Sequence, residues 1–440
     1  MSEIKKKIIG LMDPNHYAFL RSLENLIAYQ KPVIKTKTQT CEVVTERVKC
    51  KPYDVLDAHI YTNFDVIMNR GSHWNPHRNS LFTVLSTKVH MIYNMFSFKT
   101  IDKNAGYGQM HELGINIPAT WAIPQQDYSD LDDPKIKVPV HKDLIFEDHE
   151  LFDLRALGEK VGYPAFLKPQ DGGGWVGVEK VTNYEELQKA YDKSGEKPQN
   201  LQRGIDYKEF VRSVGIGCQI MPMHYNAETK FSHDRYIRSE EKAIEHNFLT
   251  ENERKEVIQL IKIINAFYGW EHNSCEALIS KDDAKIYVID FANAYPDSDV
   301  ISLHYYFPGV VKAMAKWLIF CCVNPRHNKL NFMSEWPKYY KVLEEAKKKN
   351  LSYHEKLDKY EKIADDYFET KKFEEFCTEH LPDFDKKAFE FFSSQKFEEI
   401  LEEAVKRYFR IPEEVPEKMA HYKGLHNFWL HCEKNRLERA

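Results

Sequence analysis

The amino-acid sequence predicts a mixed α/β protein that ends in a helical region. Short apolar runs alternate with helix-like patterns over about the first 95 residues, which is typical of an α/β domain. Beyond about residue 335, Lys, Glu, Phe and Tyr dominate and no glycine occurs before Gly424, which indicates helices. At roughly 150 residues per domain, the 440 residues suffice for two or three domains. We expect an α/β domain over 1–95, a central domain over 96–330 and a helical region over 331–440.

The amino-terminal domain opens with a strand and a helix. Ile8 to Met12 form a short apolar run behind a lysine cluster, and apolar residues then recur at helical spacing up to Ile27. Further strands are expected over 65–69 and 89–93, with a helix-like segment between them. The stretch 125–150 is polar and irregular, so we expect an exposed excursion there and not a domain boundary.

Near the carboxyl end, apolar residues at i, i+3 and i+4 spacing predict an amphipathic helix: Phe397, Ile400, Leu401, Ala404, Val405 and Tyr408. The Glu and Lys residues of its other face are expected to be solvated. The nearby aromatic residues are expected to form a packed helical core and not a stacking platform: Phe384, Phe389, Phe391 and Phe392.

The composition excludes several classes of protein. Hydrophobic residues at 42%, aromatics at 13% and charged residues at 29% are ordinary for a globular chain and exclude disordered and collagen-like classes. Lys and Arg number 62 against 67 Asp and Glu, for a net charge of -5. That balance lacks the basic excess of a protein that binds nucleic acid phosphates, so we expect no nucleic acid partner.

We expect a cytoplasmic protein without a membrane anchor. The apolar part of the amino end is too short for a secretory signal. The apolar stretch from Val310 to Val323 is interrupted by Lys312 and Lys316 and is shorter than the ~20 residues that span a bilayer, which predicts a buried helix. The eight cysteines contain no CxxC pair, so we expect reduced, buried thiols and neither a disulfide framework nor a thiolate metal site.

A glycine-rich loop follows a short strand in the segment from Tyr163. The strand carries Lys168, and after the loop a return strand leads to a helix that a capping box of Thr182 and Glu185 is predicted to open. The loop glycines are 172, 173, 174 and 177. A Rossmann motif requires them to open a helix, and a P-loop requires Lys and Ser or Thr after the last glycine; neither holds. What remains is a hairpin loop whose backbone N–H groups can approach phosphates, with Lys168 either beside those phosphates or simply at a strand end.

Five motifs in order resemble the ATP-grasp superfamily of ligases: Lys103 before 113–118, Lys168 before the glycine-rich loop, a hinge strand over 200–205, the acid Glu209, and two strands that carry Glu276, Asp290 and Asn293. The resemblance covers roughly residues 90–310 and implies an ATP-grasp fold with an amino-terminal pre-ATP-grasp domain. It assigns the nucleotide to these residues: Lys103, Lys168, Gly172, Gly173, Gly174, Gly177, Gln202, Ile205 and Glu209. It also implies that Glu276, Asp290 and Asn293 hold Mg²⁺, with Mn²⁺ as the alternative, since such hard cations prefer oxygen ligands.

Two departures from the family pattern concern the metal site and the recognition of adenine. The family usually closes with Glu-x-Asn, whereas Asp290 and Asn293 are separated by two residues, so either Asn293 reaches the metal through a bulge or Asp297 replaces it. The hinge carries Gln202 where many relatives have Glu, which bears on the choice of adenine.

The resemblance implies a reaction in which a substrate carboxylate becomes an acyl phosphate that an amine or similar nucleophile displaces, releasing ADP and phosphate. A carboxylate and its acyl phosphate need a cation, and the planar fork of arginine is suited to this. Arg212 is our first candidate and Arg235 the second, ahead of Arg238, with Lys168 as a further catalytic group. The expected partners are small-molecule carboxylate and amine substrates, with amino acids or peptides as one class, and a homo-oligomer stays open.

Two other functions remain open at this stage. A kinase-like phosphotransferase also needs a glycine-rich loop, a lysine and a metal-binding acid, but the chain lacks HRDxxxxN and has DFA at Asp290 in place of DFG. A catalytically silent nucleotide-binding scaffold with a helical tail is the other alternative.

His73 and His77 lack a third metal ligand, so we expect structural or pocket-lining histidines. The segment 302–308 is expected to be core and helix entry.

Overall fold

The computed structural model describes residues 4–36, 39–49, 51–56, 63–92, 94–98, 102–128, 147, 150–172, 175–229, 231, 234–237, 248–293, 295–324, 326 and 332–439. The chain divides into two units. Unit 1 comprises Met1–Ile101, Phe210–Cys275 and Asn293–Ala440, and unit 2 comprises Asp102–Glu209 and Glu276–Ala292. This division does not test the expected boundaries at 95 and 330, which remain predictions.

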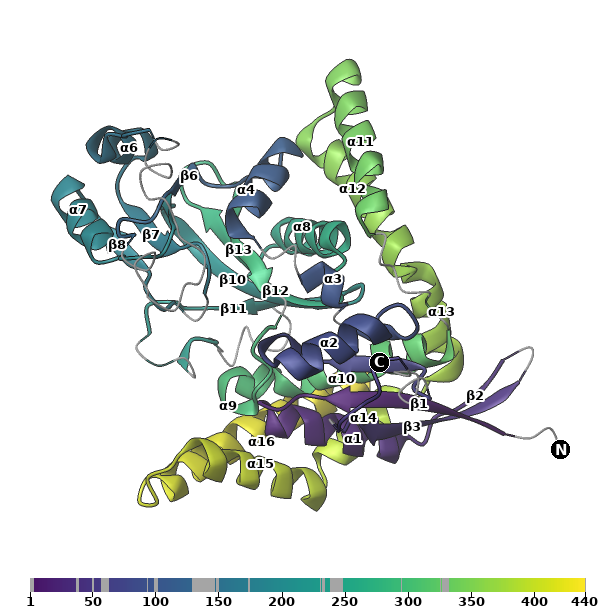
Figure 1. Ribbon diagram of the computed structural model, residues 1–440. Coiled ribbons are helices and arrows are strands. Elements are labelled where there is room, and N and C mark those ends of the chain that lie inside the picture. Colours follow the sequence, from purple (N-terminus) through teal and green to yellow (C-terminus); the bar gives the residue numbers. More distant parts are fainter. Residues whose placement is uncertain are drawn as a thin grey trace. The chain divides into compact units, whose positions relative to one another are not determined.

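Unit 1 contains a five-stranded sheet in the order β2-β3-β1-β4-β5 (Figure 1). Its strands are β1 (Lys5–Met12), β2 (Val33–Lys35), β3 (Thr40–Arg47), β4 (Val66–Asn69) and β5 (His90–Ile92). β1 pairs in parallel with β3 and with β4, β4 pairs in parallel with β5, and only the edge strand β2 is antiparallel to its neighbour. The apolar runs that predicted strands near 8 and 65 therefore form interior strands of a largely parallel sheet, and the run near 89 forms its edge strand β5. Such a sheet needs cover on both faces.

Helices supply that cover. α1 (Tyr17–Gln30) and α10 (Phe307–Val323) both pack against β1 and β3, and α1 also packs against α10. α2 (Pro76–Leu85) contributes three of its side chains to a core cluster that includes Ile67 of β4 and Met91 of β5. The cluster members are Met12, Val48, Phe64, Ile67, Leu81, Phe82, Leu85, Val89, Met91 and Met95.

α10 is a buried helix, as the sequence predicts. The stretch Val300–Val323 is long and apolar enough to cross a membrane, but 83% of its most apolar window is buried inside the structure, as in the core helix of a folded domain. Its first part comprises α9 (Val300–Leu303) and η5 (His304–Tyr306), so the segment 302–308 is core and helix entry, as expected. The seven cysteines that the structure describes are free thiols, and five of them are buried.

The carboxyl-terminal part of unit 1 is helical, which confirms the prediction. Its elements are η6 (Phe332–Glu335), α11 (Trp336–Lys349), α12 (Tyr353–Phe368), α13 (Thr370–His380), α14 (Phe384–Phe392), α15 (Gln395–Tyr408) and α16 (Val415–Arg439). α12 packs along α8 (Glu251–Tyr268), while α14 and α15 pack against α1. α15 buries five of its six predicted apolar positions, and the sixth, Tyr408, is exposed because it is the last residue of the helix. Three of the four tail phenylalanines are buried and Phe389 is half-buried.

Unit 2 contains an antiparallel sheet in the order β6-β9-β7-β8. Its strands are β6 (Thr120–Ile123), β7 (Ala165–Pro169), β8 (Glu179–Val181) and β9 (Gln199–Arg203). α6 (Leu154–Val161) and α7 (Tyr184–Asp192) accompany this sheet (Figure 1) and share a core with it that includes Ala165, Leu167 and Leu201. Because side chains alternate along a strand, Lys168 and Gln202 lie on the opposite face of the sheet.

A third sheet has the order β11-β10-β12-β13, and the boundary between the units falls within three of its strands, β10, β12 and β13. The strands are β10 (Tyr207–Ile216), β11 (Gln219–His224), β12 (His272–Ser280) and β13 (Ile286–Asn293). β12 is buried at every position, which fits the apolar character of the CEALI segment. The remaining elements are η2 (Ser72–Trp74), α3 (Met95–Phe98) and α4 (Lys103–Glu112).

Two local predictions need comment. The capping box at Thr182 and Glu185 is wrong by one residue, because Asn183 is the N-cap of α7 and its side chain accepts from the Glu186 backbone N–H. Thr182 instead donates its backbone N–H and its hydroxyl to the Glu186 carboxylate. The predicted excursion over 125–150 lies mostly outside the described residues.

Candidate functional site

Lys168 lies at the centre of a polar cluster in unit 2. Its Nζ donates to Gln202 Oε1 at 2.5 Å and to the carbonyl oxygen of Ile289 at 3.4 Å. Register explains the first contact, because β7 pairs with β9 so that Lys168 opposes Asn200, two residues from Gln202 on the same face. Lys168 lies near the end of β7, but it is not an exposed surface lysine, since its side chain is half-buried and bonded to two neighbouring elements. Its role beside phosphates stays a prediction.

The surroundings of Lys168 lower the pKa of its ammonium group. Burial lowers the pKa of Lys168 to about 8, the nearby Lys103 lowers it as well, and the carboxylates of Asp290 and Glu276 raise it. Two lysines and two acidic side chains that the sequence singled out separately therefore interact in the folded unit. Such a cluster is a typical feature of a functional site.

Lys103 reaches the same cluster from α4. Asp102 is the N-cap of this helix, so Lys103 is its first residue, and the Lys103 Nζ donates to Asp290 Oδ2 at 3.2 Å. Both side chains are mostly buried, at 11% and 20% exposed, so their charges are poorly screened by water. Asp102 Oδ2 accepts from Gln170 Nε2 at 3.1 Å, which links the start of α4 to the end of β7.

The carboxylates of this cluster fit a magnesium site. Asp290 Oδ1 is buried and has no hydrogen-bond partner among the residues that the structure describes, although the other carboxylate oxygen is paired with Lys103. An unsatisfied buried carboxylate oxygen is costly unless a ligand completes it. Glu276 on β12 is 4% exposed and acts electrostatically on the same Lys168. Two carboxylates with a vacant lone pair are the donor set through which Mg²⁺ usually binds in proteins.

The hinge strand holds Gln202 firmly. Its Oε1 accepts from Lys168, and its Nε2 donates to Thr120 Oγ1 of β6 at 2.9 Å. Both ends of this amide are thus used inside unit 2. Ile205 follows β9 and is half-buried, and Glu209 is half-buried on β10.

The glycine-rich loop joins β7 to β8. Gly172 has a φ of +126° and Gly177 a φ of +75°, conformations that favour glycine. At Gly177 a Cβ would lie 2.9 Å from the ring of Pro169, so the close return of the loop also requires glycine there. Gly173 and Gly174 lie outside the described residues. Trp175 also has a positive φ, and its ring packs edge-on against Phe166 of β7 at 6.4 Å.

The candidate arginines and the last metal candidate belong to unit 1. Arg212 on β10 donates to Tyr225 Oη at 3.2 Å and to Ser274 Oγ at 3.3 Å. Arg235 is half-buried with its Nε unpartnered, and Arg238 lies outside the described residues. Asn293 donates its side-chain Nδ2 to the carbonyl oxygen of Ser274 at 3.3 Å.

Asp297, the alternative to Asn293, is also in unit 1. Its Oδ1 accepts from the backbone N–H of Asp299 and lies 3.8 Å from His16 Nε2. Whether Asn293 or Asp297 completes a metal site therefore remains a prediction.

The segment RGSHWNPH owes much of its structure to Arg70, which is completely buried in unit 1. Arg70 donates from Nε to Asp13 Oδ2 at 2.6 Å and from its terminal nitrogens to the Pro296 carbonyl oxygen at 2.7 Å and to His272 Nδ1 at 2.8 Å. Burial and the charge of Arg70 lower the pKa of His73 to about 4. A neutral His73 packed against Trp74 fits a structural role.

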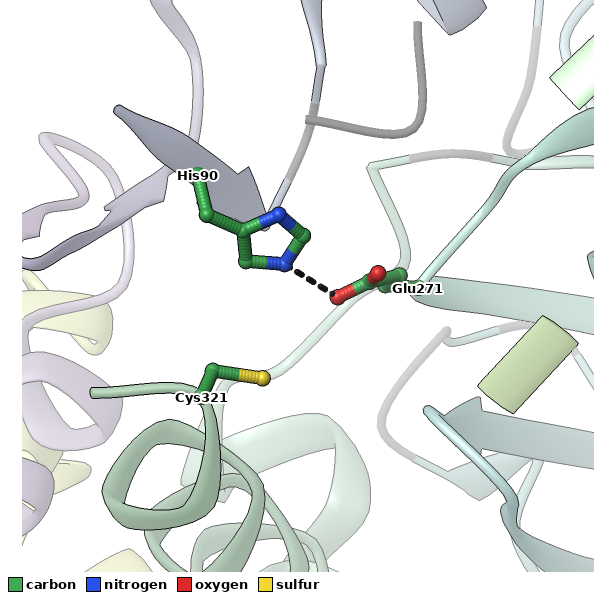
Figure 2. Close-up of side chains that lie close together, drawn as sticks. All are labelled: His90, Glu271 and Cys321. Carbon is green, nitrogen blue, oxygen red and sulfur yellow. Dashed lines mark hydrogen bonds and ion pairs between the residues drawn. The ribbon is translucent and has the colours of Figure 1, made fainter. Parts of the chain in front are cut away.

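A second buried cluster in unit 1 joins His90, Glu271 and Cys321 (Figure 2). Their potential ligand atoms lie within 4.8 Å of one another, and among the residues that the structure describes they are the one such group. However, the Glu271 carboxylate already accepts from His90 Nε2 and Trp317 Nε1, each at 3.0 Å, and from Arg326 at 3.3 Å.

The protonation of this cluster favours an ion pair over a metal centre. Burial raises the pKa of Glu271, but His90 and Arg326 outweigh it and lower the pKa to about 2. Burial raises the pKa of the Cys321 thiol well above its usual range, which disfavours the thiolate that a metal requires. We conclude that this cluster joins β5, α10 and the segment before β12 through hydrogen bonds and ion pairs.

Sequence reasoning did not find Tyr107, and it gave Asn200 no role beyond a place in the hinge strand; both residues lie in unit 2. The Tyr107 hydroxyl donates to the carbonyl oxygen of Ile289, beside Asp290, and the Asn200 side chain is fully buried with both polar atoms unpartnered. The spacing of Tyr107 four residues after Lys103 is the one signal that could have indicated the first, since it puts both on one face of α4. Asn200 opens the predicted hinge strand, but no pattern in the sequence marks its side chain as buried beside the site.

Comparison with known proteins gives partial matches. Residues 131–269 match the family described as D-ala D-ala ligase C-terminus. The D-alanine–D-alanine ligase of Thermoanaerobacter sp. (strain X514) is 37% identical over 108 residues, which cover 21% of this chain and 30% of that protein. The enzyme of the same name from Synechococcus sp. (strain RCC307) is 33% identical over 85 residues, covering 19% and 24%. The chain thus spans less than a third of the length of these curated relatives.

Two solved structures are similar over much of the chain. One is the D-alanine–D-alanine ligase from Bacillus anthracis complexed with ATP, at 14% identity and a TM-score of 0.44, covering 73% of this chain and 97% of that chain. The other is a RiPP-associated ATP-grasp ligase from Chryseobacterium gregarium in complex with ADP and a leader and core peptide, at 13% identity and a TM-score of 0.45, covering 74% and 98%. Similarity at this level does not bear on activity.

Proposed function

We propose that this chain is an ATP-grasp ligase that uses ATP to join a carboxylate to an amine. The match of residues 131–269 to the family described as D-ala D-ala ligase C-terminus and the partial match to D-alanine–D-alanine ligases support this proposal. The observation that carries the proposal is the cluster in unit 2, where Lys168, Lys103 and Asp290 meet and Asp290 Oδ1 lacks a partner. Cations for phosphate oxygens and a carboxylate for a divalent ion are what phosphoryl transfer from ATP requires.

The first step forms an acyl phosphate. A substrate carboxylate oxygen attacks the γ-phosphorus of ATP, the bond from that phosphorus to the bridging oxygen breaks, and ADP leaves with the electron pair. Lys168 and Lys103 stabilise the phosphate charge, and the loop around Gly172 and Gly177 offers backbone N–H groups. In the second step the amine attacks the acyl carbon, the bond from that carbon to the phosphate oxygen breaks, and phosphate leaves as the nitrogen loses a proton.

Magnesium, or manganese in its place, would be held by Glu276 and Asp290, with Asn293 or Asp297 as a third ligand. Once bound, the ion would neutralise part of the negative charge of the phosphates. Gln202, Ile205 and Glu209 are assigned to the nucleoside end. Arg212, and after it Arg235, is assigned to the substrate carboxylate and its acyl phosphate, because a guanidinium grips two oxygens at once.

The proposed substrates are a small carboxylic acid and a small amine, of the amino-acid or peptide class. Support for this class comes from the D-alanine–D-alanine ligases that match part of the chain. The proposal includes a cytoplasmic location, no nucleic acid partner and no membrane association. Whether the protein forms a homo-oligomer stays an open question.

Hydroxylamine trapping tests the proposal. The full chain is incubated with ATP, Mg²⁺, hydroxylamine and pools of carboxylic acids, and ADP and hydroxamates are followed by mass spectrometry. An acid-dependent hydroxamate that Asp290→Asn does not produce would support acyl phosphate formation and identify the acid. ADP together with a stable phosphorylated product would favour a kinase, and ATP binding without turnover in any pool would favour a scaffold.

A further inference from the structure

Tyr107 lies where the nucleotide-binding and metal-binding residues of unit 2 meet. It is 4% exposed on α4, one helical turn after Lys103, so both side chains leave the same face of the helix. Its hydroxyl donates to the carbonyl oxygen of Ile289 at 2.6 Å. Ile289 directly precedes Asp290 on β13, so this bond fixes the backbone next to the carboxylate.

The ring of Tyr107 contacts β13 at the residue that follows Asp290. It packs edge-on against Phe291 at 5.6 Å, with an angle of 80° between the rings. The hydroxyl and the ring thus contact the residues before and after Asp290, while Lys103 on the same helix pairs with the Asp290 carboxylate. α4 therefore binds three consecutive residues of β13 through two side chains.

The same hydroxyl is linked to Lys168. The carbonyl oxygen of Ile289 accepts from the Tyr107 hydroxyl and from Lys168 Nζ, so the two side chains share one backbone acceptor. Burial, followed by the charges of Asp290 and Glu276, raises the pKa of Tyr107 well above its usual range, so the phenol remains a donor.

We propose that Tyr107 is a positioning residue that sets the backbone of β13 so that Asp290 and Lys168 are correctly placed for ATP and its metal ion. This inference rests on the proposed function and adds a residue that neither the family motifs nor the matched segment 131–269 contains. Tyr107 acts through Ile289 and Lys168 and does not itself contact the reacting atoms.

The chain offers a matched control in Tyr191. This residue also belongs to unit 2, is 9% exposed, and donates its hydroxyl to the backbone carbonyl oxygen of Pro124 at 2.9 Å. Tyr107→Phe and Tyr191→Phe therefore delete the same atom and the same kind of bond. Tyr191 has no contact with Lys168 or Asp290 among the interactions that the structure describes, so Tyr191→Phe removes a hydroxyl-to-carbonyl bond away from the cluster.

The test measures binding of a non-hydrolysable ATP analogue to the full-length protein by calorimetry, with and without Mg²⁺, beside thermal melting. We expect Tyr107→Phe to raise the Kd about two- to tenfold, the range that one lost hydrogen bond gives, with a larger effect when Mg²⁺ is present. Tyr191→Phe is expected to leave the Kd unchanged and to lower the Tm by a similar amount.

An unchanged Kd for a folded Tyr107→Phe variant would overturn the inference, as would an equal rise in Tyr191→Phe. If Tyr107→Phe does not fold, Phe291→Leu replaces it, because that change removes the ring contact and keeps the hydroxyl. A raised Kd for Phe291→Leu supports the inference, and an unchanged one overturns it. A failure of the wild-type protein to bind the analogue would instead refute the proposed function.

Discussion

Raising the pH should weaken ATP binding through Lys168. Burial lowers the pKa of this ammonium to about 8, whereas an exposed lysine stays charged up to about 10.4. At pH 7 about nine-tenths of the Lys168 side chains carry a charge, and at pH 9 only about one-tenth do. Because phosphate oxygens favour the charged form, binding at pH 9 requires proton uptake, and we expect the association constant to fall about tenfold between pH 7 and pH 9.

Calorimetric titration with the non-hydrolysable analogue at pH 7, 8 and 9 in buffers of different ionisation enthalpy would measure both the affinity and the proton uptake. Lys168→Arg is the control, since a guanidinium does not titrate in this range. Its pH profile should be flatter than that of the wild type. A wild-type affinity that stays constant from pH 7 to pH 9, or an equal fall in Lys168→Arg, would refute the reasoning.

Three further changes have defined outcomes. Asp290→Asn should lower ADP release about a hundredfold or more while a cooperative melt is kept, because it removes the charge that we propose binds the metal ion; a variant with full turnover would exclude this role for Asp290. Glu271→Ala should lower the free energy of unfolding by about 3–5 kcal/mol in denaturant titration, because it leaves the buried donors of His90 and Trp317 without their acceptor and Arg326 with one carboxylate partner, Glu369, in place of two, and a loss below about 1 kcal/mol would contradict the ion-pair assignment. Asn183→Ala should cost about 1 kcal/mol as a lost N-cap, and Glu185→Ala less than about 0.5 kcal/mol; the reverse order would place the cap at Thr182.

The parts of the fold that depend on local patterns were predictable. The apolar run behind the first lysines became β1, and the glycine-rich segment became a hairpin loop between β7 and β8. The cap of α7 was misplaced by one residue because Thr182 and Asn183 are both good N-caps and each has a Glu three residues later. Choosing between two such neighbours depends on where the preceding strand ends, which the local pattern does not contain.

The contacts within the candidate site were beyond the reach of sequence patterns. Lys103 and Asp290 are separated by 187 positions, and Tyr107 and Ile289 by 182. Motif order predicted that the first pair serves one site, but nothing in the motifs involves Tyr107. Arg70 shows the same limitation, since its buried partners come from the end of β1, the start of β12 and the segment after β13.

The interleaved path of the chain has a consequence for its synthesis on the ribosome. The polypeptide passes between the two units four times, after residues 101, 209, 275 and 292. Every residue of unit 2 has therefore been made by position 292, whereas unit 1 must wait for the helices after Asn293, including α10 beneath its first strands. The five strands of the amino-terminal sheet are therefore translated first, but their helical cover is completed last, and until then the apolar face that α10 covers needs protection from other chains.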